Sequence, residues 1–278
     1  YQTRIGNKVG LRLFGNLTYS KNKIVFRDEP AMQYAYQKSE GTRYGEFYGY
    51  IAEGYFQSEE EIKKSPRQMR ELAPGDIKYK DLNDDGVIDA NDQCYLGKSW
   101  FPSWSYGMGF NINYHNFDLA LFFQGVSDVS IMANGGSIDT GNGDWGASGV
   151  GIVPFTGMGL NPSNVITKAL DRWTADNPRA DAWYPRMTAN ATTNDNNYVN
   201  STHWLKDGSY LRLKQASLGY TLENKKLMDK GIEYLYFYLS GQNLLTFSKF
   251  KLWDPELGSN GAKYPLSRMV TLGMRVSF

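Results

Sequence analysis

Apolar and polar residues alternate with a period of two along six segments of the chain. Between Trp104 and Tyr114 the even positions are aromatic or apolar, and the odd positions are Ser, Gly or Asn. The same alternation resumes at Phe117, after a short corner at His115. Because successive side chains of a β-strand point to opposite faces, this pattern predicts strands with one apolar face. The predicted strands cover residues 9–20, 103–114, 117–125, 210–222, 232–246 and 264–278.

The lengths of these strands and of their connections favour a membrane barrel. Most of the strands are about twice as long as the ~5–6 residues usual in soluble proteins, whereas membrane-spanning strands need about 9–11. Short and long connections alternate strictly, as the short periplasmic turns and long extracellular loops of outer-membrane barrels do. A single strand of this kind also fits a soluble sandwich, but loops of such length are rare in a compact soluble domain. The predicted fold class is therefore all-β, a segment of a transmembrane antiparallel β-barrel with about six strands here.

Composition and charge exclude several other classes of protein. The chain has 278 residues, of which 15% are aromatic and 29 are glycine, which suits a β-rich protein. The 30 Lys and Arg nearly cancel the 29 Asp and Glu, so we expect no nucleic-acid partner. Two histidines cannot form a multi-histidine zinc site, and the single Cys94 cannot form an internal disulfide. The first residues lack the features of a signal peptide, so we expect either that a signal was removed or that the chain starts within a longer protein.

An acidic motif in the first long connection has the spacing of a calcium-binding loop. Residues 81–92 carry oxygen-bearing side chains at loop positions 1, 3, 5, 9 and 12, with Gly86 at position 6 and Ile88 expected to point inward. The five carboxylates in this loop would repel each other without a cation, which favours a structural Ca²⁺ ion over an acidic turn without metal. The expected ligands are Asp81, Asn83, Asp85, the carbonyl of Val87, Asp89 and Asp92.

Several motifs together resemble the SusC/RagA-type TonB-dependent outer-membrane transporters. The matching segments are Tyr44–Tyr50, Gly54–Ile62, Gly75–Gly97, the 104–125 hairpin, Leu170–Thr174, Asp207–Leu213, Leu218–Thr221, Ser240–Leu244 and the last strand. The resemblance implies that residues 1–278 form the C-terminal portion of a 22-stranded barrel, integral to the bacterial outer membrane and in contact with membrane lipid. It also implies import of oligosaccharides or peptides with a SusD-like lipoprotein, a plug and N-terminal barrel strands elsewhere in the transporter, and the TonB complex as energy source.

The last strand has a second expected role in assembly. Apolar residues recur at every second position and end in an aromatic residue, a pattern that resembles the C-terminal signal read by the barrel-assembly machinery. An ordinary edge strand that ends in Phe is the alternative. The residues of the expected signal are Val270, Leu272, Met274, Val276 and Phe278.

The sequence shows no catalytic constellation, so we expect no enzyme and no catalytic residues. We expect His115 and His203 to be surface residues and Cys94 to be a buried thiol. The substrate-binding residues stay unknown from the sequence. The loop tryptophans can pack the loops together or stack on sugars, and packing is the preferred interpretation; they are Trp145, Trp173, Trp183, Trp204 and Trp253. The alternative function is a soluble, calcium-stabilised, extracellular carbohydrate-binding β-domain.

Overall fold

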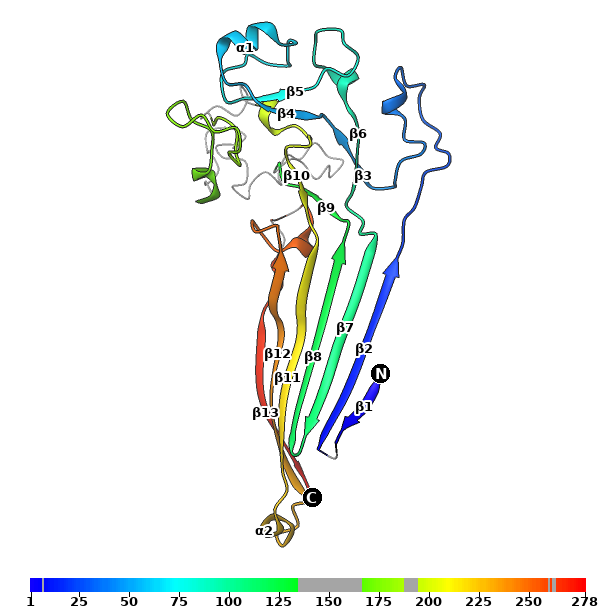
Figure 1. Ribbon diagram of the computed structural model, residues 1–278, viewed down its shortest axis with the longest axis vertical. Helices are drawn as coiled ribbons and strands as arrows, with labels where there is room; N and C mark the ends of the chain where they lie inside the picture. Colours follow the sequence, from blue (N-terminus) through cyan, green and yellow to red (C-terminus); the bar gives the residue numbers. More distant parts are fainter. Residues whose placement is uncertain (7, 135–166, 188–194, 260, 262–263) are drawn as a thin grey trace.

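A single long antiparallel sheet dominates the computed structural model, which describes residues 1–6, 8–134, 167–187, 195–259, 261 and 264–278. Its strand order is β1-β2-β7-β8-β11-β12-β13 (Figure 1). We call this sheet the wall. Its strands are β1 Gln2–Ile5, β2 Val9–Tyr19, β7 Trp104–Tyr114, β8 Phe117–Ser127, β11 Tyr210–Leu222, β12 Tyr234–Ser248 and β13 Met269–Ser277.

The connections of the wall are sorted by length between its two ends. The β7–β8 turn and the connection that holds the short helix α2 (Lys225–Met228) lie together at the lower end in Figure 1. The long connections lie at the upper end, where they fold into a separate layer that we call the head, made of the described residues within 20–103, 128–209 and 249–268. The sorting of loops predicted from the sequence is therefore confirmed.

The head is built from three two-stranded ribbons and short helices. The ribbons pair β3 (Glu46–Gly49) with β6 (Cys94–Ser99), β4 (Ala52–Tyr55) with β5 (Ile77–Tyr79), and β9 (Ser130–Met132) with β10 (Leu205–Asp207). The helix α1 (Glu59–Lys64) begins where the side chain of Ser58 accepts a hydrogen bond from the Glu61 amide. The 3-10 helices are η1 Ala35–Gln37, η2 Ala90–Asp92, η4 Thr167–Leu170, η6 Asp195–Tyr198 and η7 Pro255–Leu257.

Each predicted strand overlaps one wall strand, and the differences have local causes. β1 was not predicted, because its four residues are too few to display an alternating pattern. β13 starts at Met269 rather than at 264. Met269 pairs with Gln242 of β12, and the next residue of β12, Asn243, has a left-handed φ of 53° that interrupts the regular pairing. The short ribbons of the head were also not predicted, because three or four residues carry no readable period.

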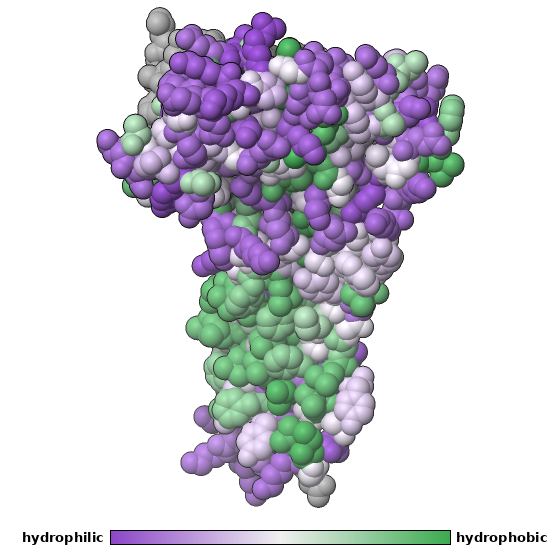
Figure 2. All heavy atoms as spheres, turned by 45° about the horizontal axis from the view of Figure 1, so that its top comes forward, coloured by the Kyte–Doolittle hydropathy of each residue, from purple (hydrophilic) through white to green (hydrophobic). Residues whose placement is uncertain are grey.

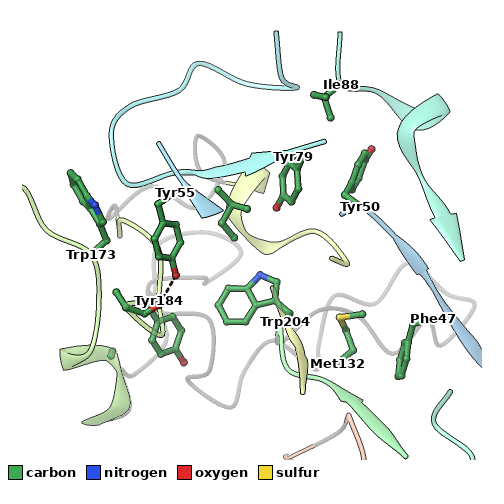
Figure 3. Packing of buried hydrophobic residues seen from close by; sticks show 12 residues of the cluster. Phe47, Tyr50, Tyr55, Tyr79, Ile88, Met132, Trp173, Tyr184 and Trp204 are labelled. Atoms are coloured by element: carbon green, nitrogen blue, oxygen red, sulfur yellow. Dashed lines mark hydrogen bonds between the residues drawn. The ribbon is translucent and has the colours of Figure 1, made fainter. Parts of the chain in front are cut away.

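The buried apolar core lies in the head rather than in the wall. Twelve buried residues form its main cluster, among them Tyr55, Tyr79 and Trp204, which Figure 3 shows gathered between the ribbons. Trp204 and Ile77 are fully buried. In the wall, by contrast, most side chains of both faces are partly or fully exposed. A sheet with two uncovered faces needs further contacts to be stable, so the chemistry of each face indicates what covers it.

Glycines and aromatic rings are placed opposite one another across neighbouring wall strands. A Cβ atom at Gly219 would come 2.2 Å from the Tyr236 hydroxyl oxygen, and one at Gly273 would come 2.2 Å from the Tyr238 ring. The rings therefore lie over the glycine backbone of the next strand. This arrangement explains why the chain is rich in both residue types.

Candidate functional site

One face of the wall is apolar across all of its long strands. The register aligns Leu11, Ile112, Leu119, Leu218, Leu239 and Leu272 in one continuous row. The adjacent row towards the head contains Leu13, Phe110, Leu121, Ala216, Gly241 and Val270. Figure 2 shows the result as a broad hydrophobic band on the stem, bounded by hydrophilic residues above and below. An apolar patch of this extent on a protein surface indicates contact with another apolar phase.

Aromatic residues lie at both borders of the apolar face. At the border near the head, the rings of Tyr19 and Trp104 are 4.5 Å apart. At the other border, the rings of Phe117 and Tyr220 are 4.7 Å apart, beside Tyr114. Aromatic girdles of this kind mark the two interfaces of membrane barrels.

The separation of the two borders matches the thickness of an outer-membrane apolar layer. Ten residues separate Trp104 from Tyr114 on β7, which is about 34 Å along a strand at ~3.4 Å per residue. A strand tilted by about 40° then crosses about 26 Å, close to the ~25 Å height of the apolar band of membrane barrels. No helix in the described part of the chain is long and apolar enough to cross a membrane.

The opposite face of the wall carries mostly small, polar and charged residues, and the rings of Phe14 and Phe122 stack on it at 6.1 Å. Near its lower end, the Tyr236 hydroxyl donates a hydrogen bond of 3.0 Å to Asp118. The Arg275 guanidinium lies over the Tyr236 ring, 5.9 Å from its centroid. Tyr236 and Tyr238 stack at 5.9 Å. Such a face suits a water-filled or protein-filled lumen, where polar groups find partners.

Side-chain amides hold the ribbons of the head together. One edge of β5 is buried but has no partner strand. Gln68 takes the place of a strand there by donating to the Ile77 carbonyl (2.9 Å) and accepting from the Tyr79 amide (2.7 Å). Asn197 accepts from the Ile77 amide at 2.8 Å and donates to Asp76 at 2.8 Å. Because buried backbone groups are costly when unpaired, these contacts fix the long connections to each other.

Two ion pairs, each with one buried and one partly buried side chain, anchor parts of the head. Arg186 binds Asp76 through two hydrogen bonds of 2.9 and 3.0 Å. At the top of the wall, the buried Arg212 of β11 binds both oxygens of Asp254 at 2.6 and 2.8 Å, and its Nε lies 3.0 Å from Glu256. The Arg212–Asp254 ion pair joins the connection after β12 to β11, and so holds this part of the head against the upper end of the wall.

The predicted calcium loop is held in shape by its own side chains. Asp81 accepts hydrogen bonds from the amides of Asp84 and Gly86, and Asp85 accepts one from Val87. Gly86 has the left-handed φ of 82° expected for the sharp turn, and Ile88 points inward with 1% of its surface exposed.

The ligand set of this loop is chemically suitable for calcium but is not gathered around one point. Asn83 donates to Asp85, and Asp89 caps η2 by accepting from the Asn91 amide. Both oxygens of the buried Asp92 accept amide hydrogen bonds, from Leu82 and Asp89. Among the described residues, no three side chains of His, Cys, Asp or Glu come close enough together to hold a metal ion. Calcium therefore stays a prediction here.

The expectation for His203 was wrong. It is partly buried, and its ring lies against the aromatic core of the head, 4.7 Å from the ring of Trp204 and 5.5 Å from that of Tyr55. Burial lowers the pKa of His203 to about 4, so the ring is neutral at pH 7. The sequence could not show this, because a histidine in a long loop has no periodic pattern to place it.

The other sequence-predicted residues lie where packing explains them. Trp173 and Trp204 are buried and Trp183 and Trp253 are partly buried, as the packing interpretation requires, while Trp145 lies outside the described residues. Cys94 is a buried thiol, as expected. The expected assembly residues are on or next to β13, with Val270 69%, Leu272 80% and Phe278 85% exposed, and Met274 and Val276 between them.

Comparisons with known proteins find homologues of the chain. The chain is 30% identical over 241 residues to the TonB-dependent receptor P26 of Formosa agariphila, and 28% identical over 255 residues to the TonB-dependent receptor P3 of the same organism. These matches cover 81% and 86% of the chain. The chain is homologous to TonB-dependent receptors. It spans 22% of the length of each of these two receptors.

Two solved structures have a fold similar to that of the chain. The RagAB peptide importer in its open-open state matches all of the chain with a TM-score of 0.67 at 21% identity, over 27% of that protein's chain. A structure of the RagAB peptide transporter matches with a TM-score of 0.68 at 19% identity, over 28% of its chain. No protein-family model matches the sequence. The sequence relatives of this chain are named as receptors, in agreement with the expectation that it is not an enzyme.

Proposed function

We propose that this chain forms the C-terminal part of the barrel wall, and the extracellular head above it, of a nutrient importer in the bacterial outer membrane. The apolar face of the wall carries the proposal, because it is continuous across six strands and bordered by aromatic rings at a separation that fits the membrane. The homology to TonB-dependent receptors supports the same assignment.

The two faces of the wall define its proposed neighbours. Membrane lipid covers the apolar face, and the plug of the transporter fills the lumen against the polar face around Asp118 and Tyr236. N-terminal barrel strands pair with the free edges of β1 and β13, which the sheet leaves without partners among the described strands. The TonB complex supplies energy through parts of the transporter beyond this segment.

The position of the head suggests its proposed partner. The head lies at the end of the wall opposite the short turns, which is the extracellular end if the turns are periplasmic. There it meets a SusD-like surface lipoprotein and the nutrient, an oligosaccharide or a peptide. The barrel-assembly machinery recognises the terminal residues from Val270 to Phe278 during insertion.

Membrane fractionation tests this function. We expect the intact protein to stay in the outer-membrane fraction after urea extraction, to require detergent for solubility, and to migrate differently in SDS gels before and after heating. Release of the protein into the soluble fraction without detergent, with no effect of heating on migration, would contradict the proposal. That result would favour the soluble carbohydrate-binding domain instead.

We also propose that the 81–92 loop binds a structural Ca²⁺ ion that stabilises the head. The hard oxygen donors Asp81, Asn83, Asp85 and Asp89 and the turn at Gly86 support it. Bound metal would neutralise the carboxylates and hold the loop over Ile88. A direct measurement of calcium binding is given among the predictions below.

A further inference from the structure

A basic cavity lies in the head, beside the upper end of the wall. It has a volume of about 420 Å³, which is within the ~300–1,000 Å³ typical of pockets for small ligands. Four lysines and one aspartate line it, a formal excess of three positive charges, together with three apolar side chains. The lining residues are Lys168, Lys206, Asp207, Lys249, Lys251, Trp183, Phe250 and Leu252.

The lysines of this cavity come from three separate parts of the chain. Lys206 lies on β10, Lys249 and Lys251 follow β12, and Lys168 lies on η4. Among the described residues, Lys168 is the one lysine of the cavity that forms an ion pair with a carboxylate, that of Asp171 at 2.7 Å. Lysines that converge from distant segments without matching carboxylates create a positive potential that favours an anion.

Lys206 is the most enclosed of the four. Its ammonium donates to the His203 carbonyl at 2.6 Å and lies 5.2 Å from the centre of the Trp183 ring. Burial and, to a smaller extent, the positive charge of Lys168 lower the pKa of Lys206. A bound anion would reverse this effect, because it stabilises the charged ammonium.

The apolar lining indicates what kind of anion fits. Trp183 supplies a partly exposed aromatic surface next to the ammonium groups, whereas Phe250 is buried, with 7% of its surface exposed. The flat C–H face of a pyranose can pack on such a ring while a carboxylate or sulfate on the sugar meets the lysines, each of which is a flexible point charge. We propose that this cavity binds an acidic oligosaccharide, and so selects anionic glycans for the importer.

This inference extends the proposed function by naming a substrate class, and calorimetry on the intact protein in detergent tests it. The probes are tetragalacturonate, the neutral maltotetraose and tetraglutamate. The variant K249Q/K251Q removes two exposed lysines of the cavity, and K225Q/K226Q removes two exposed lysines of α2 at the opposite end of the wall as a matched control.

We expect tetragalacturonate to bind at least about tenfold more tightly than maltotetraose, and added salt to weaken it. K249Q/K251Q should lower this affinity about tenfold, whereas K225Q/K226Q should leave it within about twofold. Equal affinity for the neutral sugar, preference for tetraglutamate, or equal effects of the two variants would overturn the inference. Failure of the membrane assignment would appear in fractionation instead, and would leave binding in detergent unchanged.

Discussion

An arginine introduced on the exposed apolar face of β13 tests whether that face contacts lipid or water. Val270 lies in the same row of the wall as Phe110. On β7, Phe110 is four residues from the aromatic border at Tyr114 and six residues from the border at Trp104. With about 3.4 Å per residue and a tilt of about 40°, it is roughly 10 Å from the nearer border, close to the middle of the apolar layer. Arginine near the midplane of a membrane barrel costs about 2–4 kcal/mol.

The prediction compares Val270→Arg with Thr271→Arg, the neighbouring exposed residue on the other face of the same strand. We expect Val270→Arg to destabilise the protein refolded into liposomes by about 2–4 kcal/mol and Thr271→Arg by less than about 1 kcal/mol. The assay is the folded fraction as a function of urea concentration, read from heat-modifiable migration. If water surrounded Val270, which is 69% exposed, its change would cost at most about 0.5 kcal/mol. Equal, small effects of the two variants would therefore refute the reasoning.

Three further predictions address assembly, calcium and packing. Phe278→Ala should lower the amount of folded protein in the outer membrane, measured as the heat-modifiable band, and unchanged amounts would count against an assembly signal. Asp85→Ala should abolish Ca²⁺ binding measured by calorimetry on the intact protein, and the same binding isotherm in both proteins, or none in either, would exclude the loop as a calcium site. Gly219→Ala should destabilise the wall by about 1–3 kcal/mol, because its Cβ would meet the Tyr236 hydroxyl at 2.2 Å. Tyr236→Ala in the same protein should recover part of that loss in the urea assay, and additive losses would contradict the proposed contact.

The wall could be predicted from the sequence because its chemistry repeats. Alternation along β7 and β8 assigns each side chain to a face, and the register then joins these faces into one apolar surface. Short turns such as the one at His115 could be recognised for the same reason, since they interrupt a regular pattern. The calcium motif was recognisable from spacing alone, and its Gly86 and Ile88 have the conformation and burial expected.

The head could not be predicted in the same way, because its contacts join residues far apart in the chain. Gln68 completes the edge of β5, and Arg212 binds Asp254 across 42 positions. The basic cavity depends on the approach of Lys206 to Lys249, which belong to different connections.

Spin labels along β12 test the central claim most directly. In a protein whose buried Cys94 is replaced by serine, single cysteines at Phe237, Tyr238, Leu239 and Ser240 carry a nitroxide each, in liposomes. We predict frequent collisions with oxygen, which concentrates in lipid, at 237 and 239, and few at 238 and 240. Equal oxygen accessibility at all four positions, or an alternation that is the same without lipid, would contradict a wall that faces the membrane.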